Sequence, residues 1–276
     1  MKQIHIRSQT GFAHVLLVLL VLVVLGVVGF VGWKVLGGKN STQTSQLDAA
    51  STASKDGNVD PDDPSKPPLA IKHVGINLGD YNPATNKAGD LVFTKDGLES
   101  YGNLLFFDYG AVAEANSAAQ RRLNPQPTFI VPLGTKIHSL VDGVVVNVPK
   151  LYSNDYSIQV GVSAKSPWLY ETEHVINPTV KVGDTVKAGQ VIAEASTHDS
   201  QYHPGFGLYE IGILHAGNPP QHVCPFNYLD KSIKNHVFKK LTNFYAAWET
   251  YQGDMTLYDE SKHVVPGCYT LDPVDG

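Results

Sequence analysis

Two glycine-centred turns lie close together in residues 180–195, which read VKVGDTVKAGQVIAEA, and they restrict the fold strongly. Apolar and polar residues alternate through this stretch, which is the pattern of a half-buried strand. Gly183-Asp184 and Gly189-Gln190 interrupt the pattern where a strand must reverse, because glycine accepts positive φ at little steric cost. The stretch predicts a small hairpin unit whose interior side chains are Val180, Val182, Val186 and Ile192.

A second unit with a related layout precedes it at residues 131–148, VPLGTKIHSLVDGVVVNV. Gly134-Thr135 and Asp142-Gly143 mark its turns. Its apolar positions are Val131, Ile137, Val141 and Val145. Two such units can close on each other and bury both apolar faces, which removes exposed edges from a short sheet. We therefore expect the two units to pack together.

The surrounding chain, from about Leu69 onward, consists of short β-branched or aromatic runs separated by Gly, Asp, Asn and Pro. Many short strands between turn residues predict a mainly β barrel or sandwich. Two segments depart from this pattern. Residues 111–123, AVAEANSAAQRRL, are alanine-rich and predict a short helix that stops at Asn124-Pro125.

The second departure is residues 232–251, SIKNHVFKKLTNFYAAWETY. Apolar residues recur there at spacings of three and four, which indicates one apolar face of a helix. That face comprises Ile233, Val237, Leu241, Phe244, Tyr245 and Trp248. Gly253 is expected near the end of the helix, and we expect the helix to pack on the β domain.

An apolar segment near the N-terminus, residues 11–33, contains no charged residue and one polar residue, His14. A helix of about 23 residues at about 1.5 Å each crosses the roughly 30 Å hydrocarbon core of a membrane. The segment is longer than the apolar part of a secretory signal, about 7–15 residues, so we expect a retained transmembrane anchor. Lysines flank it on both sides, so its charge bias is weak. The polar tail and the cysteines favour an extracytoplasmic C-terminal domain.

Residues 37–69 are rich in Gly, Ser, Thr, Asp and Pro and contain almost nothing that can be buried, which predicts a disordered linker. The predicted organisation is therefore a cytoplasmic tip and transmembrane anchor at 1–36, the linker at 37–69, a β domain at 70–231 and a C-terminal helical extension at 232–276. The net charge of −5, without a long basic run, argues against nucleic acid as a partner.

The chain has two cysteines, Cys224 and Cys268. In an exported domain an even pair indicates a disulfide, whereas in a reducing compartment it would indicate two separate buried thiols. With the predicted export we expect a disulfide that fastens the C-terminal extension to the β domain. On the chain-entropy account a closed loop of about 45 residues is stabilised by roughly 3–4 kcal/mol.

A series of short motifs then follows one order along the chain: PLGT at 132–135, DGVV at 142–145, EHV at 173–175, the glycine turns of 182–192, YEI at 209–211 and PFNYL at 225–229. From about Asn103 to Asp230 this order resembles the lysostaphin-type murein metalloendopeptidase family. The resemblance implies a duplicated-hybrid-motif β fold and zinc-dependent cleavage of peptide cross-links in bacterial cell walls. Biotin and lipoyl carriers share the glycine turns, but the lysine tip of a carrier is absent here.

The resemblance also implies a ligand set: a histidine and an aspartate in an early H-x-x-x-D, and the second histidine of a late H-x-H, with an open position for water. Aligning Glu210 with the glutamate after H-x-H puts Phe206 and Leu208 at the two histidine positions. The early motif falls near residues 104–112 and supplies only Asp108, with Leu104 or Val112 as its partner. His174 matches an auxiliary histidine of the family. We therefore predict a pseudoenzyme without a cofactor, with zinc as the alternative.

A relocated metal site would draw on His198, His203 and Asp108, although their spacing matches no known metal motif. The groove is predicted to be lined by Asp108, Tyr109, His174, Leu208 and Tyr209. The leading functional hypothesis is a single-pass cell-membrane protein whose extracytoplasmic domain binds, without catalysis, a cell-wall peptide or glycan (peptidoglycan) or a partner hydrolase. The alternatives are an active zinc metalloendopeptidase with a non-standard ligand set and a structural envelope protein.

Overall fold

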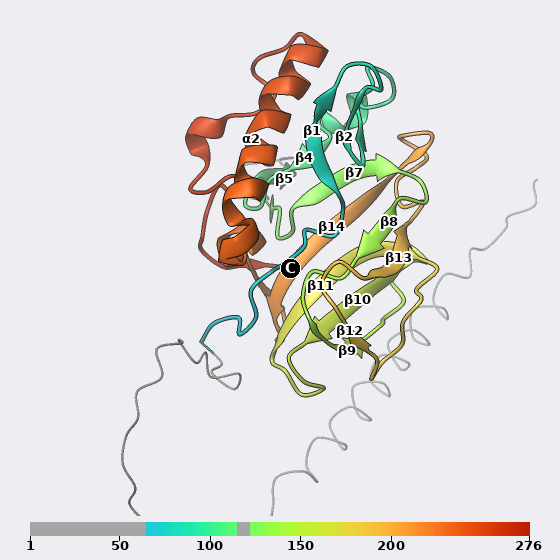
Figure 1. The fold of residues 1–276 in the computed structure, drawn as a ribbon, viewed down its shortest axis with the longest axis vertical. Coiled ribbons are helices and arrows are strands. Elements are labelled where there is room, and N and C mark those ends of the chain that lie inside the picture. Colours follow the sequence, from blue (N-terminus) through green and yellow to red (C-terminus); the bar gives the residue numbers. More distant parts are fainter. Residues whose placement is uncertain (1–64, 115–121) are drawn as a thin grey trace, which may run out of the picture. The chain divides into compact units, whose positions relative to one another are not determined.

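The computed structural model describes residues 65–114 and 122–276 (Figure 1). The predicted anchor at 1–36 and residues 37–64 of the predicted linker lie outside the described residues. No helix within the described ranges is both long and apolar enough to cross a membrane. Leu69 is held by the β domain, because its backbone N–H lies 2.6 Å from the Tyr170 hydroxyl.

Strands dominate the described part of the chain. Those that precede residue 150 are β1 (Leu78–Asn82), β2 (Lys87–Gly89), β3 (Leu91–Val92), β4 (Phe106–Phe107), β5 (Val112–Glu114), β6 (Arg122–Leu123), β7 (Thr128–Pro132), β8 (Lys136–His138) and β9 (Gly143–Asn147). The later strands are β10 (Tyr156–Gly161), β11 (Trp168–Ile176), β12 (Thr185–Val186), β13 (Val191–Ala195), β14 (Phe206–His215), β15 (Gln221–Val223) and β16 (Val274–Asp275). The helix α2 spans Lys231–Gln252, and the 3-10 turns are Glu99–Tyr101, Pro225–Tyr228 and Glu260–Lys262. The predicted mainly β fold with a C-terminal helix is confirmed.

The two glycine-turn units pair with each other in the main antiparallel sheet, as predicted. Strand β8 pairs with β13, and β9 pairs with β12. The interior positions are fully buried at Val131, Ile137, Val141, Val145, Val186 and Ile192. Val182 was predicted to be interior, but it is 59% exposed. It stands immediately before Gly183, whose φ of 91° reverses the chain, so its side chain lies on the outside of the turn.

The C-terminal helix α2 forms as predicted and covers the upper part of the β domain (Figure 1). The Asp230 side chain caps its first turn by accepting a hydrogen bond from the Ser232 backbone N–H. Gly253, with φ of 78°, ends the helix in the left-handed conformation that favours glycine. Its buried face is Val237, Leu241, Phe244, Tyr245, Trp248 and Glu249. Trp248 meets Phe93 edge-to-face, with ring centroids 5.0 Å apart, which joins the helix to the chain after β3.

The predicted helix at residues 111–123 is wrong at both of its ends. Val112–Glu114 and Arg122–Leu123 are the antiparallel strands β5 and β6, and residues 115–121 lie outside the description. Alanine propensity is a weak signal, and pairing of the flanking residues overrides it. Asn124 follows directly and donates its backbone N–H to the Ala111 carbonyl at 2.7 Å.

The predicted disulfide joins Cys224 to Cys268. It lies beside the segment that follows β4, because Tyr109 forms an isolated bridge with Cys268. The Tyr109 backbone N–H donates to the Gly267 carbonyl at 3.0 Å, and the Tyr269 N–H donates to the Tyr109 carbonyl at 2.9 Å. The C-terminal extension is thus fixed to the β domain by a covalent link and by backbone pairing at the same place.

Candidate functional site

Three adjacent strands, β7, β14 and β11, form the floor of the candidate site. Their register places Thr128 opposite Glu210 and Glu210 opposite Glu173. Side chains alternate along β14, so Leu208 and Glu210 share one face while Tyr209 is fully buried on the other. The hydroxyl of Thr128, the first residue of β7, lies 3.1 Å from Glu210 Oε1 and 3.0 Å from the Gln126 carbonyl oxygen, and it can donate its one hydrogen to either.

A pocket of about 200 Å³ opens on this floor. It is lined by Tyr101, Phe107, Ala111, Val112, Asn124, Thr128, Leu208 and Glu210. One wall comes from the chain after β4 and from β5, and Tyr101 comes from the preceding 3-10 turn. The pocket is therefore largely apolar, with three polar side chains on its floor and side.

The pocket brings together residues with the spacing that the family resemblance implies for its zinc ligands. Asn124 and Thr128 have the spacing of H-x-x-x-D, and both line the pocket together with Leu208, the counterpart of the second histidine of H-x-H. The prediction that Asp108 supplies the early ligand near residues 104–112 is wrong, because Asp108 is buried and held by Tyr245 and His263. The strand that faces Leu208 is β7, which runs directly into PLGT at 132–135.

The side chains in these positions do not fit zinc. Leu208 offers no donor atom, and zinc in proteins takes thiolate, imidazole or carboxylate ligands rather than the amide of Asn124 or the hydroxyl of Thr128. Glu210 is the single carboxylate among the residues that line the pocket. Its Oε1 lies 3.1 Å from the Thr128 hydroxyl. A tetrahedral site with three protein ligands is not formed in this position.

His174 lies beside the pocket floor and is hydrogen-bonded from behind. Its Nδ1 is 3.0 Å from Asp155 Oδ2, and the Ser196 hydroxyl donates to the same oxygen at 2.6 Å. Burial would raise the pKa of Asp155, but hydrogen bonds from His174, Ser153 and Ser196 outweigh it and hold that pKa at about 2. Burial would lower the pKa of His174, but the hydrogen bond to Asp155 and the charge of Glu210 raise it above its ordinary value.

His198 stacks face to face on His174, with ring centroids 3.8 Å apart and ring planes 13° apart. Burial and the neighbouring His174 lower the pKa of His198. Asp155, His174 and His198 each present a potential ligand atom within 4.8 Å of the others, as do Glu173, His174 and Glu210. Ring nitrogen lone pairs lie in the ring plane, so two parallel stacked imidazoles do not point at one shared ion. His174 and His198 would have to separate before both could bind one metal.

The floor of the site is acidic. Glu173 and Glu210 are cross-strand neighbours, and Glu171 lies two residues before Glu173 on the same face of β11. Burial, together with the charges of Glu171 and Glu210, raises the pKa of Glu173 to about 8. Burial also raises the pKa of Glu210. For Glu171, hydrogen bonds from His222, Gln159 and Ser157 outweigh burial and lower the pKa. Gln126 bridges the cluster, because its Nε2 is 3.1 Å from both Glu171 Oε2 and Glu173 Oε2.

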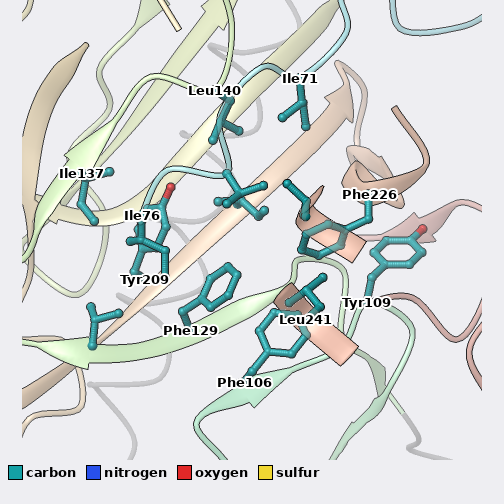
Figure 2. Packing of buried hydrophobic residues seen from close by; sticks show 14 of the residues in the cluster. Ile71, Ile76, Phe106, Tyr109, Phe129, Ile137, Leu140, Tyr209, Phe226 and Leu241 are labelled. Carbon is teal, nitrogen blue, oxygen red and sulfur yellow. The ribbon is translucent and has the colours of Figure 1, made fainter. Parts of the chain in front are cut away.

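The structure brings together only part of the predicted groove. His174 and Leu208 lie at the site, but the prediction that Asp108, Tyr109 and Tyr209 line it is wrong. Tyr109 and Tyr209 are fully buried among apolar side chains (Figure 2). The Tyr109 hydroxyl lies 2.8 Å from the His222 carbonyl oxygen and 2.7 Å from the Asp272 carbonyl oxygen, and its single hydrogen can be donated to either. Asp108 is 3% exposed and accepts a hydrogen bond from Tyr245 of α2 at 2.8 Å. All three residues support the fold.

Two of the predicted metal candidates, His203 and Asp108, do not join His198. His203 is buried, packs at a tilt against Tyr101 with ring centroids 4.0 Å apart, and is hydrogen-bonded through Nδ1 to the Gly97 carbonyl. Asp108 lies 3.0 Å from His263 Nε2 in the C-terminal extension. Sequence reasoning missed Asp155, Glu173 and the Asn124–Thr128 pair. The Asn124–Thr128 pair could have been found from the strand TFIVP, because this strand leads directly into PLGT and the early motif could have been placed at its start.

A family model and several solved structures each match part of this chain. The model of Peptidase family M23 matches residues 127–213, which confirms the resemblance to the lysostaphin type. The antimicrobial peptidase lysostaphin from Staphylococcus simulans is 20% identical, with 46% of this chain and 50% of that chain covered and a TM-score of 0.36. The solution structure of lysostaphin is matched over 43% of its own length.

Two further solved structures are similar at the same level. A mutant catalytic domain of the prophage-encoded M23 protein EnpA from Enterococcus faecalis is 22% identical, with 43% of this chain and 85% of that chain covered and a TM-score of 0.33. A zinc-containing peptidase from Vibrio cholerae is 18% identical, with 54% of this chain and 39% of that chain covered and a TM-score of 0.34. No curated protein matches the chain.

Proposed function

Since the chain carries a segment of peptidase family M23 of the lysostaphin type, we propose that it is a non-catalytic member of that fold which binds a cell-wall peptide. One observation carries the proposal: Leu208, with Asn124 and Thr128, stands where the family's zinc ligands are expected. A zinc-bound water is the reagent of the family's reaction, so a domain without that ligand set keeps the groove and lacks the chemistry.

The character of the groove supports binding. Ligand sites are concave and mostly apolar, with a few placed polar groups, and the pocket above β7 and β14 has this make-up. An exposed tyrosine stands nearby: Tyr152 is 87% exposed, and its ring centroid is 6.1 Å from that of His198. Tyrosine combines an apolar ring with a polar tip, which suits contact with peptides and sugars.

The proposed setting is the outer side of a cell membrane. The uncharged segment at 11–33 would anchor the chain, and the polar residues that follow would let the domain reach away from the surface. The disulfide between Cys224 and Cys268 suits an oxidising, extracytoplasmic compartment. A glycan or a partner hydrolase is the alternative occupant of the groove in this setting.

A second candidate is a zinc endopeptidase with a non-standard ligand set. The observation that favours it is the set Asp155, His174 and His198, whose ligand atoms lie within 4.8 Å of one another. This candidate requires the stacked rings of His174 and His198 to separate on metal binding, whereas the non-catalytic function leaves them as they are.

One experiment on the full-length chain separates these two candidates. The purified protein is incubated with insoluble cell wall, with and without added zinc and with a chelator, and both sedimentation with the wall and release of soluble wall fragments are measured. We expect sedimentation without release. A Leu208→Arg variant, which places a charged side chain in the pocket, should sediment less, while Met255→Ala at an exposed position of the C-terminal extension should behave like the natural protein.

Release of fragments that the chelator stops, and that His174→Ala abolishes, would establish the enzyme instead. Failure of the natural protein to sediment with any wall preparation would exclude a cell-wall ligand.

A further inference from the structure

We propose that the pocket recognises a primary ammonium group carried on an unbranched aliphatic stem, such as a lysine-type side chain of a peptide. This inference rests on the proposed binding function and names the chemical class that the groove selects. It follows from the shape of the pocket, from two acceptor atoms that receive no hydrogen bond from the described residues, and from the local charge.

The size and walls of the pocket suit one side chain. Its volume of about 200 Å³ is below the roughly 300–1,000 Å³ of pockets that hold a whole drug-sized ligand. Phe107, Val112 and Leu208 offer apolar contact along its length. A lysine-type stem is a chain of methylenes that gains by such burial while its charged end seeks acceptors. The ring of Tyr101 lies edge-to-face with Phe107, with centroids 5.8 Å apart, and supplies an aromatic face at the same wall.

The polar end of the pocket offers acceptors that nothing in the described chain uses. Asn124 is 8% exposed and lines the pocket. Its Nδ2 donates to the Asp108 carbonyl at 3.3 Å, and its Oδ1 accepts no hydrogen bond from any described residue. This amide oxygen is therefore available to a donor on a ligand that enters the pocket.

Glu210 supplies the second acceptor. Its Oε1 lies 3.1 Å from the Thr128 hydroxyl, but the closest cationic partner of Oε2 is His174 Nε2 at 3.9 Å, beyond hydrogen-bond length. An ammonium group has three donors and no acceptor. Asn124 Oδ1, Glu210 Oε2 and the Thr128 hydroxyl oxygen supply three acceptor atoms on residues that line one pocket, which is the number of donors that an ammonium group carries.

The local charge favours a cation in this place. Four carboxylates, Asp155, Glu171, Glu173 and Glu210, line or support the floor. None has a lysine or arginine partner among the described ion pairs, and their cationic neighbours are histidines alone. Glu173 and Glu210 stand directly opposite each other in the sheet, so ionising both carboxyl groups would place like charges side by side. A bound ammonium group would allow Glu210 to carry its charge beside Glu173, and the removal of the ammonium group from water would be compensated by charge-assisted hydrogen bonds.

The test uses the full-length chain and a matched pair of peptides, acetyl-Ala-Lys-Ala-amide and its norleucine analogue, which keeps the stem and lacks the ammonium group. Binding of each peptide is measured by calorimetry at low and moderate salt. We expect the lysine peptide to bind roughly ten- to a hundredfold more tightly, which is the range for hydrogen bonds to a charged group. The Glu210→Gln variant, which can still accept the Thr128 hydrogen bond, should lose this preference. Glu194→Gln should retain it, because Glu194 pairs with Lys136 outside the pocket.

Equal affinity for the two peptides would overturn the inference, and so would an unchanged preference in Glu210→Gln. If Glu210→Gln does not fold, the comparison of the two peptides on the natural protein still decides. Sedimentation with cell wall is measured in parallel. Wall binding without lysine-peptide binding rejects the ammonium inference and leaves the proposed function standing, whereas loss of both rejects the proposed function as well.

Discussion

A rebuilt zinc site would test the correspondence between this pocket and the family's metal centre. The perturbation is the triple variant Asn124→His, Thr128→Asp and Leu208→His. Thr128 and Leu208 lie on paired strands, with Thr128 opposite Glu210 and Leu208 opposite Ile130. Diagonal neighbours across a strand pair have Cα atoms roughly 7–8 Å apart, and zinc bonds of about 2.0–2.2 Å from two side chains can bridge that separation.

The expected magnitude has two parts of opposite sign. Without zinc, the variant replaces Leu208, which is 7% exposed, and loses about 2 kcal/mol of apolar burial. For a domain of this size that corresponds to a fall in Tm of roughly 4–8 °C. With zinc at about a hundred times its Kd, binding adds about 2.7 kcal/mol, so Tm should rise by roughly 5–11 °C from the lowered value.

The assay is thermal unfolding of the full-length chain with zinc and with chelator. The matched control is the double variant Leu104→His and Leu208→His. Together with the native Asp108, its two histidines form the ligand set that follows if the early motif lies at residues 104–112. We expect no zinc effect in the control, because Asp108 is held by Tyr245 and His263. The reasoning fails if zinc does not raise the Tm of the triple variant, or if it raises that of the control equally.

Three further predictions concern stability and titration. Replacing both Cys224 and Cys268 by serine should destabilise the domain by roughly 3–4 kcal/mol and lower Tm by about 6–16 °C in calorimetry; an unchanged Tm would show that the backbone pairing around Tyr109 suffices. Asp155→Asn should lower the pKa of His174 in an NMR titration, because the hydrogen bond that outweighs the effect of burial is weakened. An unchanged titration midpoint of His174 would contradict the role assigned to Asp155. In the natural protein, His174 contributes to the free energy of unfolding below its unfolded pKa of about 6.5, and this contribution is lost as pH rises through its folded pKa. Asp155 contributes above its unfolded pKa of about 3.9, and this contribution is lost as pH falls toward 2. Glu173→Gln should raise the urea midpoint at pH 8 more than at pH 4, because the folded carboxyl, with a pKa of about 8, holds a proton that the unfolded chain releases near pH 4.5; an equal gain at both pH values would contradict this.

Much of the fold could be predicted because its signals are local. Glycine turns at Gly183 and Gly189, the apolar face of α2 and the stop at Gly253 each depend on a few adjacent residues. The helix expected at residues 111–123 failed because alanine content describes an isolated segment, whereas the pairing of β5 with β6 depends on two segments meeting.

The site was less accessible to sequence reasoning because it is assembled across strands. His174 and Leu208 were found by motif order, but Asp155 reaches His174 from the position just before β10, and nothing in its own neighbourhood marks it. Asp108 and Tyr109 were misplaced because polar and aromatic residues near a motif look like groove residues. Their burial against the C-terminal extension is a tertiary fact.

The attachment of the C-terminal extension has a consequence for how a ligand is received. Phe107 and Ala111, which line the pocket, flank the segment that Tyr109 and Asp108 fasten to the disulfide and to α2. A wall braced from behind in this way leaves little room for induced fit. A ligand would meet a slot already in its bound shape, so little conformational entropy would be lost on association and discrimination between ligands would come from shape and charge alone.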